Sequence, residues 1–175
     1  MMSWLQENYG TTLSNPIIQS VLIVLGAVIV AKITDLIFSR IFKRFVDKTQ
    51  TILDDQILQL LHRPIFYTIL FIGFSIAVKT AGLPEYFDFV LVGIFKTITI
   101  LIWLVIAMKV LVVSMEWASK KTTNPLLQQK TLPLFNNLGK IGVGLFGIYF
   151  IFLSWDININ GILASAGVLG VVLGL

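Results

Sequence analysis

The chain has 175 residues, of which 57% are hydrophobic and 13% are charged, and its mean hydropathy is +0.91. Soluble domains carry about 25% charged residues, so this composition excludes an ordinary soluble protein and predicts an all-α, polytopic membrane protein. Cysteine is absent and His62 is the single histidine, which excludes disulfides and metal sites built from several Cys or His ligands.

The N-terminal segment, residues 1–15, contains Trp4 and Tyr9 among polar residues. Aromatic side chains are enriched at membrane interfaces, so we expect an interfacial segment, with a frayed tail as the alternative. Residues 1–16 contain no Lys or Arg, whereas a signal peptide needs a basic region before its apolar core. We therefore expect no cleavable signal peptide and a retained first helix.

The first predicted span runs from about Pro16 to Phe38, with Asn15 as N-cap and Pro16 at the first helical position. Its continuation to residue 46 is amphipathic. A helix over 16–46 would be roughly 46 Å long, whereas the hydrocarbon core is about 30 Å thick. The basic end must therefore emerge among the headgroups, where its side chains either bind anionic lipids or only set the topology. These side chains are Lys32, Arg40, Lys43 and Arg44.

Two adjacent carboxylates, Asp54 and Asp55, precede the second predicted span. Paired carboxylates can serve acid–base catalysis or metal binding, but the neighbouring sequence does not complete such a site. We interpret them as acids in the first turn of a helix, where the helix dipole favours negative charge. Thr51 and Asp54 resemble a capping box at the start of that helix.

The second predicted span covers Pro64 to Ala81, and the third covers Phe89 to Met115. The third contains Lys96 and Lys109, and lysines within a membrane are candidates for function. About 18 Å of helix separates them, so each ammonium group can extend toward its nearer membrane surface. We favour that explanation, with a role in packing, lipid contact or ion passage as the alternative.

The fourth predicted span runs from Pro133 or Leu134 to about Ser154, and a polar turn containing Trp155 leads into a fifth span from about Ile159. The residues from 160 to 175 are apolar and rich in Gly, Ala and Ser. Such a segment makes a poor helix in water, but small residues let membrane helices approach closely. We expect it to pack against other helices. We also expect more chain after it, because no helix-stop signal closes the pattern.

Basic residues occur in every second predicted connection between spans and are absent from the others. Five lie in residues 39–63 and three in 116–132, whereas none lies in 1–15, 82–88 or 154–160. By the positive-inside rule, the N-terminus is outside, the two basic connections are cytoplasmic, and the fifth helix runs toward the cytoplasm.

Two stretches carry a family resemblance: Thr51-Ile-Leu-Asp-Asp55 with Leu60-Leu-His-Arg-Pro64, and Trp155-Asp-Ile-Asn with the small-residue segment 161–175. Together with five spans and an outside N-terminus, they resemble the small-conductance mechanosensitive channel (MscS-like) family, in a five-helix variant. The resemblance covers the chain from about Thr51 onward and is most specific at 161–175. In that family the last membrane helix continues into a cytoplasmic domain, so the resemblance implies a sequence truncated in the pore helix.

The resemblance implies a homo-heptamer in the cell (inner) membrane, whose last membrane helix lines a central pore. Residues 16–154 would form a tension-sensing paddle of four helices, and residues 155–175 the outer turn and the first part of the pore helix. Val171 and Leu175 would be apolar constricting rings one helical turn apart, and such rings close pores by dewetting. Further implied positions are Ala164 and Val168 in the pore lining, Gly167, Gly170 and Gly174 in helix packing, and Trp155 at the lipid interface.

This chain has Val168 and Leu169 where the family more often has small residues, which limits how tightly neighbouring helices can pack there. The alternative for 161–175 is an ordinary buried helix in a single-chain bundle.

The leading hypothesis is a tension-gated ion channel that releases ions and small osmolytes on hypo-osmotic stress. Tension favours a wider open state, because that state occupies more membrane area, and so shifts the population toward it. The alternatives are the membrane part of a secondary transporter, although the span centres offer few polar groups, or a scaffold without transport. Membrane lipids and copies of the same chain are the expected partners. No enzymatic activity, cofactor, metal or nucleic-acid partner is expected.

Overall fold

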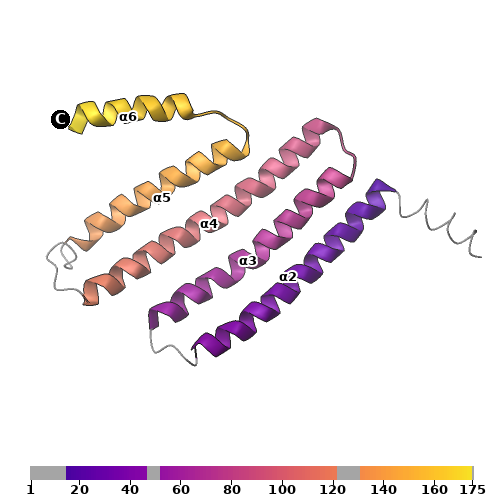
Figure 1. The fold of residues 1–175 in the computed structure, drawn as a ribbon, viewed down its shortest axis with the longest axis horizontal. Helices are drawn as coiled ribbons and strands as arrows, with labels where there is room; N and C mark the ends of the chain where they lie inside the picture. Colours follow the sequence, from indigo (N-terminus) through magenta and orange to yellow (C-terminus); the bar gives the residue numbers. More distant parts are fainter. Residues whose placement is uncertain (1–14, 47–51, 122–130, 175) are drawn as a thin grey trace, which may run out of the picture.

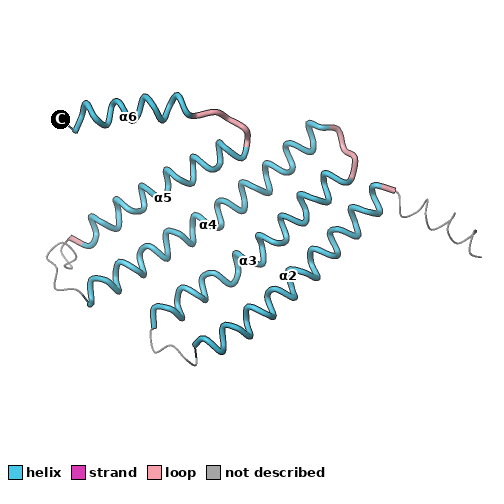
Figure 2. The backbone as a smooth tube through the Cα atoms, viewed as in Figure 1, coloured by secondary structure: helices cyan, strands magenta, loops and turns pink. Residues whose placement is uncertain are grey.

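The computed structural model describes residues 15–46, 52–121 and 131–174, and in these ranges the protein is all-helical, without strands. In Figures 1 and 2 the helices between residues 16 and 154 lie side by side in one layer, each antiparallel to the next, and the last helix is set apart from the layer. The helices are α2 (Pro16–Val46), α3 (Ile52–Thr80), α4 (Glu85–Lys121), α5 (Leu132–Ser154) and α6 (Asn160–Gly174).

The four layer helices are each long and apolar enough to cross a membrane, whereas α6 is a shorter apolar helix of 15 residues. The predicted all-α membrane protein is therefore confirmed. The apolar spans in the layer are Pro16–Arg40, Gln59–Thr80, Glu85–Ser119 and Leu132–Ser154.

The start of α2 follows the predicted capping pattern. Asn15 Oδ1 accepts a hydrogen bond from the backbone N–H of Ile17 at 3.0 Å, and Pro16 occupies the first helical position. An N-cap side chain satisfies one of the donors that a helix start leaves without a partner, and proline has no N–H to satisfy. The helix then continues through the basic segment to Val46, as its amphipathic pattern predicts.

Helix α3 differs from the predicted second span, because Pro64 lies inside the helix and not at its start. Interior prolines are tolerated in membrane helices when neighbouring groups compensate for the backbone groups they free. The group that Pro64 frees is the carbonyl oxygen of Leu60, four residues earlier, because proline has no N–H to donate to it. Pro64 itself is fully buried, and its own carbonyl oxygen accepts a hydrogen bond from Thr68 Oγ1 at 2.7 Å. Asp54 and Asp55 lie in the first turn of α3, as interpreted, and the proposed cap Thr51 lies outside the described residues.

Small residues bring the layer helices together. A Cβ atom at Gly73 of α3 would collide with Cβ of Ala27 on α2, and Ala31 and Ala77 are buried in the layer. Between α4 and α5, a Cβ atom at Gly147 would collide with the side chain of Leu104. Membrane helices pack through such small residues because lipid supplies no hydrophobic drive for association.

Replacing Gly73 with Ala should separate α2 from α3 and destabilise the fold by about 1–3 kcal/mol, the usual cost of overpacking. Gly26→Ala in α2 is the matched control, because no neighbouring atom lies within 4 Å of its Cβ position. Thermal unfolding in detergent, followed by circular dichroism, compares the two. Equal melting temperatures for Gly73→Ala and the unsubstituted protein would contradict the close α2–α3 contact.

Candidate pore helix and its connection to the helix layer

Helix α6 has the composition of a buried helix, yet its side chains are exposed in the single chain. The large apolar side chains of Val168, Val171 and Val172 are 65%, 64% and 66% exposed. Every other α6 side chain that the structure describes is exposed as well. A contiguous apolar surface of this kind marks a site that contacts other protein or lipid.

The glycines of α6 also differ from those of the layer. Cβ atoms built at Gly161, Gly167, Gly170 and Gly174 would meet no neighbouring atom within 4 Å. In contrast, Cβ atoms at Gly73 and Gly147 would collide with an adjacent helix. The glycines of α6 that the structure describes therefore make no close helix–helix contact within one chain. This disfavours the alternative in which 161–175 is a buried helix of a single-chain bundle.

The residues expected to line the pore share one face of α6. Successive residues of an α-helix are turned by about 100°, which places Ala164, Val168 and Val171 within a narrow sector. Gly167, Gly170 and Gly174 occupy the neighbouring sector. The other residue expected to line the pore, Leu175, lies outside the described residues. This arrangement can present an apolar lining toward one direction and small residues toward an adjacent helix.

The turn between α5 and α6 has a defined backbone geometry. The N–H of Ile157 bonds to the carbonyl oxygen of Phe152 at 3.0 Å, and the N–H of Asp156 bonds to that of Leu153 at 3.2 Å. Asp156 has φ = 54°. This pair of bonds around a left-handed residue is a Schellman motif, which usually has Gly at that position.

The start of α6 is capped from the same turn. Asn158 Oδ1 accepts the backbone N–H of Asn160, the first residue of α6, at 3.0 Å. The short Trp-Asp-Ile-Asn sequence therefore ends one helix and begins the next.

We expect Asp156→Gly to preserve or strengthen this turn, and Asp156→Val to weaken it by about 1–2 kcal/mol, because a β-branched residue is strained in the left-handed region. Thermal unfolding of the two variants in detergent checks the expectation. An Asp156→Val protein as stable as Asp156→Gly would show that the left-handed conformation is not maintained.

Trp155, which was expected at the lipid interface, is half-buried against α4. Its indole N–H donates to Thr97 Oγ1 at 2.9 Å. Its ring covers Gly93, where a Cβ atom would lie 3.2 Å from the ring carbons, and it meets Phe89 edge-on at a centroid distance of 5.8 Å. Phe89, Gly93 and Thr97 are spaced four residues apart, so they form one face of α4. Trp155 thus ties the turn between α5 and α6 to α4 of the helix layer.

Two further polar contacts link the layer helices. Trp103 Nε1 of α4 donates to Thr68 Oγ1 of α3 at 2.9 Å. His62 Nε2 of α3 lies 3.0 Å from Asp35 Oδ1 of α2, at ion-pair distance but not aligned for a hydrogen bond. The sequence did not indicate these pairs. A partner for Asp35 could have been anticipated, because Asp35 is the single acid in residues 16–46 and ionisable residues in membrane spans usually pair with another polar group.

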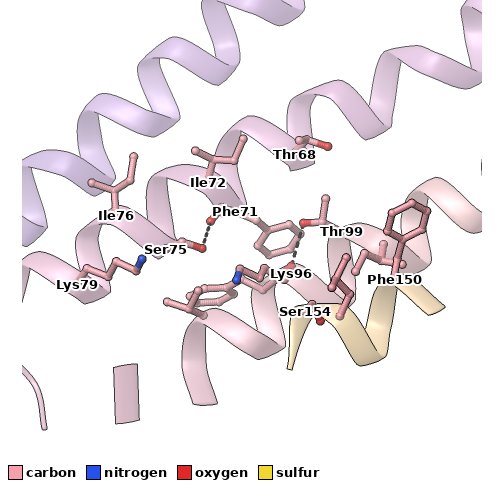
Figure 3. A pocket seen from close by; sticks show the side chains of 14 residues that line it. Thr68, Phe71, Ile72, Ser75, Ile76, Lys79, Lys96, Thr99, Phe150 and Ser154 are labelled. Carbon is pink, nitrogen blue, oxygen red and sulfur yellow. Dashed lines mark hydrogen bonds between the residues drawn. The ribbon is translucent and has the colours of Figure 1, made fainter. Parts of the chain in front are cut away.

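The lysines of the spans line open grooves. Figure 3 shows Lys79 of α3 and Lys96 of α4 at a groove of about 570 Å³, together with Phe71 and Thr99 and with Phe150 of α5. Lys109 lines a second groove between α3 and α4. Both Lys96 and Lys109 are exposed.

The basic residues of α2 were expected at the headgroups. Lys32 and Arg40 are exposed, and the side chains of Lys43 and Arg44 lie outside the described part of the chain. Within the described ranges, no group of three or more His, Cys, Asp or Glu residues is placed to hold a metal ion.

Comparison with known proteins connects α5 and α6 to a family. Residues 137–175 match the family model described as "Mechanosensitive ion channel, transmembrane helices 2/3". By that description, α5 and α6 correspond to membrane helices 2 and 3 of the family. The matched range is shorter than the range from Thr51 onward over which the sequence resembles the family. It includes the segment 161–175, in which the resemblance is most specific.

A curated relative supports the same family. The small-conductance mechanosensitive channel MscMJ of Methanocaldococcus jannaschii is 34% identical over 80 residues, which are 46% of this chain and 23% of the relative. The chain therefore matches less than a quarter of that relative's length. No solved structure matches the chain. An all-helical membrane fold, a family match across α5 and α6 and the similarity to this relative together support an MscS-like mechanosensitive channel family member.

Proposed function

We propose that the protein is a tension-gated ion channel that releases ions and small osmolytes on hypo-osmotic stress. The observation that carries this proposal is α6: a Gly-rich apolar helix, exposed within one chain, that matches the membrane helices of mechanosensitive channels. Copies of α6 arranged around an axis would cover this surface and enclose a pore. The membership of the family supports a function without enzymatic activity.

The proposed assembly is a homo-heptamer in the cell (inner) membrane. Its pore face consists of Ala164, Val168, Val171 and Leu175, and the apolar rings at Val171 and Leu175 close the pore by excluding water. Gly167, Gly170 and Gly174 face the neighbouring copy, where small residues permit repacking as the pore widens. We assign the basic connections to the cytoplasmic side, so that α6 runs inward from the outer turn at Trp155.

In this proposal the layer of α2–α5 is the part that senses tension. It is one helix thick, and many large apolar side chains on it are exposed, including Leu25, Ile72, Val105 and Phe146. A thin layer with apolar surfaces is in contact with lipid over most of its area, so a change in lateral tension acts directly on it. The Trp103–Thr68 bond joins α3 and α4 within this layer, and the Trp155–Thr97 bond connects the layer to the turn that precedes α6.

The secondary-transporter alternative has less support. Transporters of that kind place discontinuous helices and polar groups at the membrane midplane. In the layer helices, Thr68, Thr97 and Thr99 each donate a hydrogen bond to a backbone carbonyl four residues earlier. The hydroxyl hydrogen of each is therefore used within its own helix and is not directed toward a substrate.

Patch-clamp recording of the purified protein in liposomes under graded suction tests the channel proposal. We expect discrete currents that appear above a threshold pressure and vanish when suction is released. The mass of the detergent-solubilised assembly tests the stoichiometry, since a heptamer has seven times the mass of the chain. Saturable solute flux by a monomer, without pressure-dependent current, would favour a transporter.

A further inference from the structure

A groove between α3 and α4, at the end of these helices away from the turn at Gly82, has a cationic end and an apolar body. We call it the Arg63–Lys109 groove. Its volume is about 920 Å³, and its lining includes Arg63 and Tyr67 of α3 and Leu101, Val105 and Lys109 of α4. It does not involve α6 and so lies apart from the proposed pore.

The charges of this groove lie together at one end. Arg63 is one helical turn from Tyr67, and Lys109 is one turn from Val105 and two from Leu101, along single helix faces. Because α3 and α4 are antiparallel, the two cations lie toward the same end, and Tyr67, Val105 and Leu101 extend from them in the same direction. This is the distribution of polarity along a membrane lipid, with a polar head and an apolar tail.

The net charge of the groove is positive. Arg63 and Lys109 are accompanied by one carboxylate, Glu116, at the lining. A guanidinium group binds phosphate through two parallel hydrogen bonds, and an ammonium group adds a second positive charge. A headgroup with a net negative charge complements this set better than a zwitterionic headgroup, which brings its own cation.

A pocket at the opposite end of α3 and α4 provides an internal comparison. Lys79 and Lys96, which also line the groove of about 570 Å³, share this pocket with the carboxylates of Glu85, Asp88 and Asp156. Three acids against two lysines leave this pocket without a positive net charge. The groove and the pocket therefore differ in charge although each contains two cationic side chains.

We propose that the Arg63–Lys109 groove binds a phospholipid with an anionic headgroup. The phosphate lies between the guanidinium group of Arg63 and the ammonium group of Lys109. One acyl chain follows the apolar side chains of Tyr67, Val105 and Leu101. The bound lipid fills the space between α3 and α4 and becomes part of the tension-sensing layer. This binding does not depend on channel activity.

Native mass spectrometry of the purified protein, titrated with phosphatidylglycerol, phosphatidylethanolamine or phosphatidylcholine of identical chains, tests the proposal. We expect phosphatidylglycerol to bind more tightly than the two zwitterionic lipids by about tenfold, the scale of one charge-assisted hydrogen bond. Arg63→Gln with Lys109→Gln should abolish this preference. The matched control, Lys79→Gln with Lys96→Gln, removes the same charge and should leave the preference intact.

Two additional variants separate the contribution of the headgroup charge from that of the acyl chain of the lipid. Arg63→Lys should retain most of the preference because it retains the positive charge. Val105→Trp should reduce binding of phosphatidylglycerol although both cations remain, because the indole occupies the path of the acyl chain. Inorganic phosphate at millimolar concentration should not displace the lipid.

Three results would overturn the proposal. One is equal affinity for the anionic and zwitterionic lipids. Another is an equal loss of preference in the control pair of lysine variants. The third is displacement of the lipid by free phosphate, which would indicate a soluble anion as the ligand. Circular dichroism and assembly mass of each variant verify that it has folded.

Discussion

Replacing Val171 with Ser is expected to make the channel open at lower membrane tension. Val171 is 64% exposed in the single chain and lies on the α6 face that we assign to the pore. An apolar ring resists wetting, and a hydroxyl group in place of the valine methyl groups reduces that resistance by roughly 1 kcal/mol per subunit. The measurement is the pressure at half-maximal current in excised patches, compared with that of the unsubstituted channel.

Leu169→Ser is the matched control for this prediction. Leu169 is as exposed as Val171 in the single chain, at 60%, but it lies on the far side of α6 from the pore face. We expect its effect on the threshold to be smaller than that of Val171→Ser. If the Leu169 variant opened more easily and the Val171 variant did not, the assignment of the pore face would be wrong.

Replacing Trp155 with Ala is expected to raise the tension needed for opening and to make the response to tension less steep. Trp155 ties the α5–α6 turn to α4 through one hydrogen bond and the contact of its ring with Gly93 and Phe89. Replacing a fully buried Trp with Ala costs about 3–5 kcal/mol, and a half-buried Trp such as Trp155 costs less. The substitution nevertheless removes both the hydrogen bond and the ring contact. Movement of the layer would then reach α6 through the backbone of the turn alone.

Smaller changes at the same contact should have graded effects. Trp155→Phe keeps an aromatic ring on Gly93 but removes the indole N–H, and Thr97→Val removes the oxygen that accepts it. Each loses one hydrogen bond, worth about 0.5–1.5 kcal/mol, so each should shift the threshold less than Trp155→Ala does. Pressure–response curves identical to those of the unsubstituted channel in all three variants would exclude Trp155 as a mechanical link.

The helices of the layer were predictable because local sequence determines them. Long apolar runs required membrane helices, and Asn15 with Pro16 marked the start of α2 by a capping rule that needs no tertiary information. Pro64 was misleading for the same reason. A proline usually begins or ends a helix, but here Pro64 lies inside α3 and is fully buried. That burial comes from packing against other parts of the fold and cannot be read from residue order.

The contacts between helices were less predictable. Trp155 was expected at the membrane interface because its position beside a polar turn suits an interfacial aromatic residue. Its contact with Gly93 and Thr97 depends on how α4 and α5 align, which the sequence does not specify. The pairing of Asp35 with His62 likewise joins residues on different helices. The small residues of α6 predict a packing helix, because few other roles explain that composition in a membrane segment, and this packing stays a prediction.

Cysteine accessibility along α6 tests the central claim, that this helix lines an ion pathway. The chain contains no cysteine, so single substitutions can be introduced without background labelling. A water-soluble, charged thiol reagent applied to open channels should react with cysteines at Ala164, Val168 and Val171 and reduce the current. Cysteines at Ile162 and Leu169, on the opposite face of the helix, should be protected. Reaction at Ile162 and Leu169, with unchanged current at the other three positions, would contradict the claim.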